Sequence, residues 1–522
     1  MDLQWHLTRL QPGSVVALQV SGKGLRGLHE AIVDLVQLGS VLVRHLLPTS
    51  HWIWVFVKGG KTILETAVTN NINLVIGDAE ITLSKNDHSK FHGIMDEKRW
   101  NFCQNHEAHG KFCDFSGFFQ KKKLNWNISF LNNILDDVPV IITAGNRPQY
   151  LSATLAALMA APGFIKENLL VLIGGHYPNT IQLLDIMEIQ YNVFDLEGNG
   201  NAKLFQYYRK VYKYVYKHYF NSKAAIFLDE DVLVSPDFFF FMSQVIPVML
   251  TDKTIYCASA YAHQSSHELY QKKDIVKRGS TQVMWGYALP MTFIREALNN
   301  WSFDIRNVAL YDAWLYEAVI GNRECIFPEV SRSKHYGTGT NTRPLEYERF
   351  SGSMEMVSEA GIYIKNLKEI PRREWENLIE NKLRQGTPVY GNPCTGHIFD
   401  NLPPGSYVFS YYVKVEDDDM YYLNSYFAIG ECLGFNAESE KGWHEGVTLL
   451  RVNEDVEIVL IGVPLSRYTY LVEKQLPAWN VQTLSSKETT ETNKKMRKYY
   501  TDKLLQIDQQ IKLNSTSELF NH

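Results

Sequence analysis

Three short apolar runs, separated by helical patterns, mark the middle of the chain. Residues 138–144, 169–173 and 224–228 are almost wholly apolar, and apolar residues at helical spacing follow the first run from 150 to 159. Strands that are apolar on both faces and alternate with helices indicate a parallel sheet covered on both sides. Ligands of such sheets bind beyond the carboxyl ends of the strands. The pattern therefore predicts an α/β domain whose site contains residues that follow these strands.

The flanking regions have different patterns. Residues 14–20 and 52–57 read as strands around a helical pattern at 28–43, which predicts a small α/β or β-rich module. Near the other end, residues 406–413 and 456–461 alternate as strands do, in a C-terminal α+β unit. The predicted division of the chain is 1–85 (β-rich module), 86–137 (polar linker), 138–390 (α/β domain), 391–475 (C-terminal unit) and 476–522 (polar tail, a loose helix or disordered).

Composition narrows the class of protein. A chain of 522 residues should hold roughly three units, and 45% hydrophobic with 21% charged residues excludes wholesale disorder. The net charge of -5 argues against a general nucleic-acid binder. No apolar run approaches the roughly 20 residues that a membrane-spanning helix needs. We therefore expect neither a nucleic-acid partner nor a membrane segment in this chain.

The strongest local signal is the acidic triplet Asp229, Glu230 and Asp231, directly after a buried strand. A hard divalent cation that also holds phosphate oxygens would explain these carboxylates, and the alternative is a solvated turn that caps the next helix. Arg147, after the first strand, either clamps a diphosphate or is an ordinary surface arginine. The loops that follow the strands contain neither a P-loop nor a GxGxxG turn, which disfavours an NTPase or a Rossmann dehydrogenase.

Two further residues have both a chemical and a structural interpretation. Asp312 stands where a helix begins, so it is either the N-cap of that helix or a general base, with Trp314 nearby to stack on a sugar. For His335 a structural role is the commoner one. The six cysteines contain no CxxC pair, so free thiols and disulfides both remain open, and Cys103 and Cys113 are close enough in sequence to pin the linker.

Several segments, in order from about residue 8 to 470, resemble the β-1,2-N-acetylglucosaminyltransferases of glycosyltransferase family 13. The resemblance is closest to enzymes that act on protein O-linked mannose and more distant to those of N-glycan synthesis. The segments that carry it are 10–16, 54–60, 138–150, 228–239, 256–260, 312–314, 323–333, 391–394, 413–419 and 461–464.

The resemblance implies a GT-A fold with a Rossmann-like mixed sheet, and an inverting, manganese-dependent transfer. UDP-N-acetylglucosamine would be the donor, and the 2-hydroxyl of mannose on an O-mannosylated glycoprotein would be the acceptor. Asp231 matches the Mn²⁺ ligand, Asp229 and Glu230 face the nucleotide sugar, Arg147 lies on the donor side and Asp312 matches the base. Disulfides are implied for Cys257 with Cys325 and for Cys394 with Cys432, as lumenal conditions permit.

The family's location is the Golgi membrane, with a type II anchor and a lumenal catalytic domain. Residue 1 falls inside the family's carbohydrate-binding stem module, so we expect this chain to lack the anchor and the first half of that module. Half a module would leave sheet edges exposed, which favours a truncated sequence over a form that naturally has no anchor.

The sequence departs from the family around the donor. Gly174 stands where the family has an aspartate that reads uracil, so a hydrogen bond to the base would be missing. The other departures are Ala262 and His263, the segment 284–287 with Trp285 and Tyr287, and Tyr316. They leave two alternatives to the predicted reaction, a transferase with an altered donor or acceptor and a glycan-binding protein without catalysis.

Overall fold

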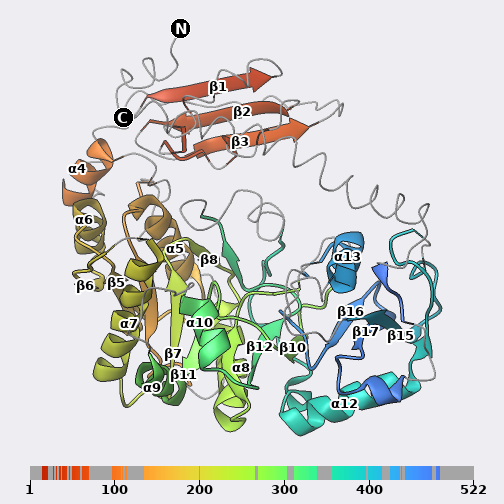
Figure 1. Cartoon of the computed structure of the whole chain (residues 1–522). Helices are drawn as coiled ribbons and strands as arrows, with labels where there is room; N and C mark the ends of the chain where they lie inside the picture. Colours follow the sequence, from red (N-terminus) through yellow and green to blue (C-terminus); the bar gives the residue numbers. More distant parts are fainter. Residues whose placement is uncertain are drawn as a thin grey trace.

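The computed structural model covers the chain and shows several sheets (Figure 1). The residues that the structure describes are 14–21, 28, 31, 35, 36, 38–40, 42, 43, 46, 50–58, 62–69, 97–106, 109, 112, 113, 134–198, 200–264, 269–301, 311–337, 354–395, 398–413, 424–435, 437, 441–472 and 478–481.

The middle of the chain forms one eight-stranded sheet. Its strands, in spatial order, are β10 (Val276–Gly279), β12 (Glu324–Pro328), β9 (Ile255–Ser259), β11 (Tyr287–Pro290), β7 (Ala224–Asp229), β4 (Val140–Ala144), β5 (Leu169–Ile173) and β6 (Gln190–Val193). Strands β7, β4, β5 and β6 are parallel, whereas β11 is antiparallel to both β7 and β9. The sheet is therefore mixed, and the sequence pattern describes only its parallel half.

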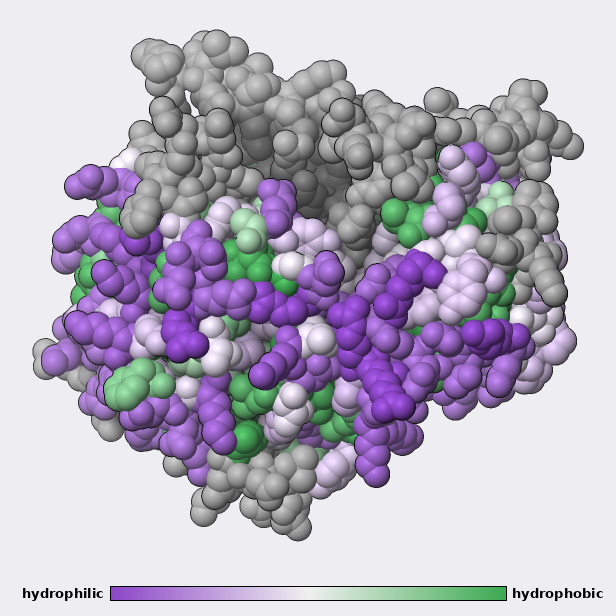
Figure 2. Space-filling model, turned by 60° about the horizontal axis from the view of Figure 1, so that its bottom comes forward, coloured by the Kyte–Doolittle hydropathy of each residue, from purple (hydrophilic) through white to green (hydrophobic). Residues whose placement is uncertain are grey.

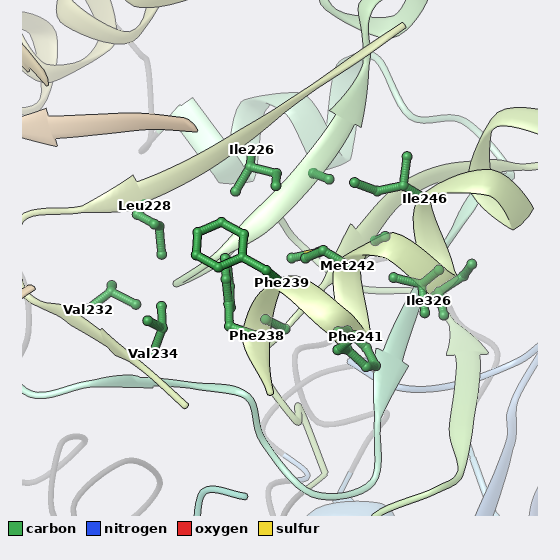
Figure 3. Packing of buried hydrophobic residues seen from close by; sticks show 14 of the residues in the cluster. Ile226, Leu228, Val232, Val234, Phe238, Phe239, Phe241, Met242, Ile246 and Ile326 are labelled. Carbon is green, nitrogen blue, oxygen red and sulfur yellow. The ribbon is translucent and has the colours of Figure 1, made fainter. Parts of the chain in front are cut away.

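Alternate residues of the parallel strands face two separate cores, as the strand period of two requires. Val140 and Ile142 of β4 pack in one core, and Ile141 packs in the other. The first core is covered by α5 (Pro148–Ala160), α6 (Pro178–Met187) and α8 (Phe238–Thr251), and the second by α7 (Gly200–His218), α9 (Met291–Asn300) and α10 (Tyr311–Ala318). Figure 3 shows Phe238, Phe239 and Met242 of α8 beside Ile226 and Leu228 of β7.

The strand order places a topological switch point between β4 and β7. After β4 the chain moves outward through β5 and β6, and it then returns to form β7 on the opposite side of β4. Sheets of this kind bind ligands in the crevice beyond such a point. Directly after β7, β8 (Val232–Val234) pairs antiparallel with β13 (Ser333–His335), and this short ribbon lies next to the acidic triplet.

The C-terminal unit has a sheet of its own. Its order is β14 (Thr387–Pro388), β15 (Gly405–Tyr412), β17 (Val456–Val463) and β16 (Val447–Arg451), and α12 (Arg372–Gln385), α13 (Asn424–Leu433) and η7 (Thr469–Leu471) accompany it. Because β14 pairs with β15, this sheet starts before the boundary predicted at residue 391. Val447 and Ile461 belong to the same buried cluster as Val140 and Ile142, so the unit shares a core with the α/β domain.

A three-stranded antiparallel sheet precedes the α/β domain, made of β1 (Val15–Ser21), β2 (Ser50–Val57) and β3 (Thr62–Thr69). Trp52, Trp54 and Phe56 are buried on one side of it. Of the helical pattern predicted at 28–43 the structure describes only separate residues, and most of the predicted linker and tail lies outside the described residues. Within the linker, α4 (Glu97–Asn105) contacts α6, so part of this segment is a helix packed on the domain.

Three disulfides join described residues. Cys257 in β9 is bonded to Cys325 in β12, and Cys394 is bonded to Cys432 in α13, which are the pairs that the family resemblance implies. Cys103 and Cys113 form the third disulfide. Short η3 (Lys166–Asn168) and η6 (Leu367–Glu369) complete the elements.

Apolar side chains are concentrated in the interior. On the face shown in Figure 2, hydrophilic residues cover most of the described surface and apolar residues lie between them in small groups. In the part of the chain that the structure describes, every helix is too short or too polar to cross a bilayer.

Candidate active site

The acidic triplet lies at the carboxyl end of β7, where each carboxylate has a different set of partners. Asp229 ends the strand, and its Oδ1 accepts hydrogen bonds of 2.6 Å from the Thr143 hydroxyl of β4 and from the Tyr208 hydroxyl of α7. Burial raises the pKa of Asp229, and the charge of Asp231 adds to the rise. Two hydroxyl donors therefore fix one oxygen of Asp229.

Glu230 and Arg147 connect the loops after β4 and β7. Arg147 Nε lies 2.7 Å from Glu230 Oε1, and the Gly145 amide donates to Glu230 Oε2 at 2.7 Å. Arg147 Nη1 also lies 2.8 Å from Asp231 Oδ2. Burial opposes the charged form of Arg147, but Asp231 and Glu230 raise its pKa. The Arg147 side chain, 35% exposed, therefore joins both acids from the loop after β4.

Asp231 is buried, with 3% exposure, and it accepts from two basic groups. His335 Nε2 lies 3.2 Å from Asp231 Oδ2, the same oxygen that Arg147 contacts. Although burial acts in the opposite direction, His335 and Arg147 hold the pKa of Asp231 below its ordinary value. A buried carboxylate that stays ionised and faces basic groups is suited to a cation.

Asp312 lies in the first turn of α10 and is partly buried. Burial raises its pKa, its own backbone amide and that of Ala313 oppose the rise, and the charge of Asp229 adds to it. The negative charge of Asp229 therefore acts on Asp312. One turn further along α10, the Tyr316 hydroxyl lies 2.7 Å from the Ser280 hydroxyl.

The turn after β5 has no acidic side chain. A Cβ atom at Gly174 would lie 3.2 Å from Tyr207 Cε2, so the Tyr207 ring takes most of the space that a side chain would need. The Tyr207 hydroxyl donates to the Leu172 carbonyl at 2.5 Å and accepts from the Ala144 amide at 3.0 Å, which holds the ring in place. On the next residue, a Cβ at Gly175 would meet the Tyr177 ring at 3.0 Å.

The other departures from the family have partners inside the fold. His263 is buried and contacts the Thr281 hydroxyl at 3.0 Å, and burial lowers its pKa to about 3. The Tyr287 hydroxyl lies 3.3 Å from that of Tyr311. Trp285 stacks on His335 with 4.8 Å between the ring centroids.

Sequence reasoning missed some of these residues. Thr143 carried a weak signal, as the one polar residue in the apolar run that becomes β4, whereas Tyr207 and Tyr208 looked like two aromatics among many in a helix. Gly337 gave no signal. A Cβ there would lie 2.6 Å from Asp231 Cγ, so the carboxylate of Asp231 and the backbone at Gly337 occupy adjoining space.

The mixed sheet, its switch point and the acidic residues after β7 agree with a nucleotide-sugar glycosyltransferase fold of the GT-A type. In agreement, residues 128–355 match the model of the GNT-I family. This segment contains Arg147, the acidic triplet, Asp312 and His335.

Solved structures with low overall similarity include nucleotide-dependent enzymes. A CMP:2-keto-3-deoxy-manno-octonic acid synthetase in complex with CTP is 11% identical, with a TM-score of 0.27, and the match covers 40% of this chain and 95% of that one. Glucosyl-3-phosphoglycerate synthase from Mycobacterium tuberculosis, in complex with Mn²⁺, UDP and glucosyl-3-phosphoglycerate, is 10% identical, with a TM-score of 0.21. That match covers 30% of this chain and 58% of the synthase.

Proposed function

We propose that this protein is an inverting, Mn²⁺-dependent transferase that moves N-acetylglucosamine from UDP-N-acetylglucosamine to the 2-hydroxyl of mannose on O-mannosylated glycoproteins. The observation that supports it most is the contact of Arg147 with Asp231 at the switch point. The charge of Asp229 also acts on Asp312 and raises its pKa. The resemblance to family 13 supplies the sugar, the acceptor and a Golgi location. It also suggests that residues 1–85 belong to a carbohydrate-binding stem module.

The residues present fit a divalent cation that is shared with a nucleotide. Asp231 offers a buried, ionised carboxylate, and His335 brings an imidazole nitrogen next to it. Within the described residues, no cluster of three or more His, Cys, Asp or Glu side chains is built to hold a metal. The two protein groups therefore suit an ion whose other ligands are diphosphate oxygens and water. Bound there, Mn²⁺ would neutralise charge on the departing UDP.

Arg147 and Asp229 have separate roles in binding the donor. Arg147 provides a guanidinium for the diphosphate, because it stands on the donor side and is kept charged by Asp231 and Glu230. Asp229 holds the nucleotide sugar with the oxygen that Thr143 and Tyr208 leave available.

Asp312 then acts as general base. As the mannose 2-oxygen forms its bond to the anomeric carbon, its proton passes to an Asp312 carboxylate oxygen, and the bond to UDP breaks on the opposite face, with the electron pair leaving on UDP. The raised pKa of Asp312 makes it a better proton acceptor than an ordinary aspartate. A single displacement of this kind inverts the sugar and needs no covalent intermediate.

Calorimetry with UDP-N-acetylglucosamine tests the donor site. We expect binding that requires Mn²⁺, that disappears in Asp231→Asn and that persists in Asp455→Asn, a matched change at an exposed aspartate. Transfer to a synthetic mannosyl peptide, with the linkage read by NMR, then tests the reaction. A folded protein that binds the mannosyl peptide but no nucleotide sugar would contradict the proposal and favour a glycan-binding protein.

One observation favours a second candidate, a transferase of the same chemistry with a different nucleotide. Gly174 and the fixed ring of Tyr207 leave no carboxylate for uracil at the end of β5. A panel of nucleotide sugars in the same calorimetry would distinguish the two, since this candidate predicts tighter binding of a donor other than the UDP sugar.

A further inference from the structure

We infer that Tyr208 is a positioning residue of the proposed transferase, which joins the donor carboxylate Asp229 to the helix that carries the proposed base. This inference rests on the proposed function. The Tyr208 hydroxyl donates to Asp229 Oδ1 at 2.6 Å, and the Tyr208 ring stacks on the ring of Tyr311. Because Tyr311 directly precedes Asp312 at the start of α10, one side chain contacts both the donor carboxylate and the residue next to the base.

The stack of Tyr208 on Tyr311 is close and buried. The two rings are nearly parallel, at 13°, and their centroids lie 3.4 Å apart, closer than in most aromatic pairs. Tyr208 has 6% exposure and Tyr311 has 7%. A ring in a closely packed interior cannot move without displacing its neighbour. The position of Tyr208 therefore limits where the first turn of α10 can lie.

The hydroxyl groups around this stack differ in their contacts. The Tyr311 hydroxyl lies 3.3 Å from that of Tyr287, which lies 3.4 Å from that of Tyr212, and both distances exceed the usual range for O–H···O hydrogen bonds. The Tyr208 hydroxyl has a short contact with a carboxylate instead. Burial and the charge of Asp229 raise the pKa of Tyr208, so its hydroxyl keeps the proton that it donates. One hydrogen bond and the ring stack therefore join Asp229 to α10, and the other hydroxyls contribute little.

Core packing alone explains this arrangement less well. A phenylalanine would fill the Tyr208 site without a hydroxyl, whose burial costs free energy unless it is hydrogen-bonded. The partner of that hydroxyl is a carboxylate that the proposed mechanism uses, and Thr143 supplies a second donor to the same oxygen. The charge of Asp229 raises the pKa of Asp312, so the separation of these two acids affects the base. A side chain that fixes this separation acts on turnover as well as on stability.

Steady-state kinetics with UDP-N-acetylglucosamine and a mannosyl peptide, together with calorimetry of donor binding, test the inference. Tyr311→Met fills the site with a flexible apolar side chain that cannot stack. Its turnover number should fall at least about tenfold, because the base is misplaced, while its donor affinity changes by less than about threefold. Tyr311→Phe keeps the ring and should have nearly the turnover number of the unchanged protein.

The hydrogen bond is tested separately. Tyr208→Phe keeps the stack and leaves Asp229 with one donor fewer, so donor affinity should fall about three- to tenfold with the turnover number nearly unchanged. Tyr212→Phe is the matched control, because Tyr212 is also buried in α7 and its hydroxyl has only the long contact with Tyr287. It should leave both quantities unchanged.

A double-mutant cycle distinguishes positioning from a general loss of packing. Tyr208→Met, Tyr311→Met and the variant with both changes are compared in turnover number at saturating donor. Because the two rings act through one stack, the double variant should be no more than about threefold slower than the slower single variant. Effects of the two changes that simply multiply would overturn the inference.

The possible failures are distinguishable. A folded Tyr311→Met protein that binds the donor and keeps the turnover number of the unchanged protein would overturn the role of Tyr208 and leave the proposed transferase intact. If Tyr311→Met does not fold, Tyr208→Phe decides, and unchanged donor affinity in that variant would overturn the inference. Unchanged protein that is folded but transfers no sugar would overturn both the inference and the proposed function.

Discussion

Two neighbouring parts of the sheet edge differ in what they offer a nucleotide sugar. The acidic corner, formed by Arg147, Asp229–Asp231 and His335 at the ends of β4 and β7, holds charged groups in mutual contact. The glycine turn, Gly174 and Gly175 at the end of β5, presents backbone covered by the rings of Tyr207 and Tyr177. Both follow buried parallel strands, but only one of them has ionisable side chains.

The acidic corner contains the groups proposed for binding the metal ion and the diphosphate, and the glycine turn lies where the nucleotide base would be recognised. In the proposed transferase, the groups assigned to the cation and the diphosphate contact one another. The turn after β5, by contrast, has a packed ring and no carboxylate for the base. A change at the acidic corner should therefore abolish the reaction or metal-dependent binding. A change at the glycine turn should act on packing and on the choice of nucleotide.

The largest effect is expected from removal of the proposed base. In Asp312→Asn the turnover number should fall by about 10²–10⁴-fold, because the amide cannot accept the proton of the attacking hydroxyl. Mn²⁺-dependent affinity for the donor, measured by calorimetry, should change by less than about threefold, since Asp312 does not contact the diphosphate groups in the proposed mechanism. Unchanged turnover in the variant would refute the assignment of the base.

Gly337→Ala should disturb the acidic corner by a steric clash, without a change of charge. The new methyl group would lie 2.6 Å from Asp231 Cγ, so Asp231 must move. We expect affinity for Mn²⁺ with UDP to fall at least about tenfold and unfolding free energy to drop by roughly 1–3 kcal/mol. Gly405→Ala is the control, because a Cβ there meets its nearest atom only at 3.6 Å. If the two variants bind Mn²⁺ equally well, Gly337 does not position Asp231.

Gly174→Asp tests whether the glycine turn can regain a carboxylate. The added Cβ would meet Tyr207 at 3.2 Å, and that ring is fixed by two hydrogen bonds, so urea unfolding should show a loss of about 1–2 kcal/mol. Gly174→Ala should show most of the same loss, because the clash begins at Cβ. A stable Gly174→Asp variant would contradict this expectation, because it would show that the Tyr207 ring moves aside at little cost. A stronger preference of that variant for UDP over CDP would show that a carboxylate in this turn can recognise the base.

The sequence predicted correctly those features that depend on the residues of a single strand. The apolar runs that become β4, β5 and β7 located the parallel half of the sheet, and with it Arg147 and the acidic triplet. Their contacts were harder to predict, because Arg147 meets Asp231, and His335 meets the same oxygen, from segments far apart in the chain. The antiparallel β11 was missed for a similar reason, since its direction depends on pairing with β7 and β9. The effect of the Asp229 charge on Asp312 could not be predicted either, because periodicity does not reveal it, and the role of Asp312 as base stays a prediction.

The smallest effect concerns His263, which follows β9, outside both of the regions compared above, and which burial keeps neutral. Burial lowers its pKa to about 3 in the folded protein, against an ordinary 6.5 in the unfolded chain. Below pH 6.5 the unfolded chain binds a proton that the folded protein does not, so this residue's contribution to stability is lost as pH falls from 6.5 toward 3. Between pH 7.5 and 5.5 the loss should be about 1.4 kcal/mol. His263→Gln should remove that part of the pH dependence in urea titrations, whereas an equal slope in both proteins would mean that His263 becomes protonated within the fold.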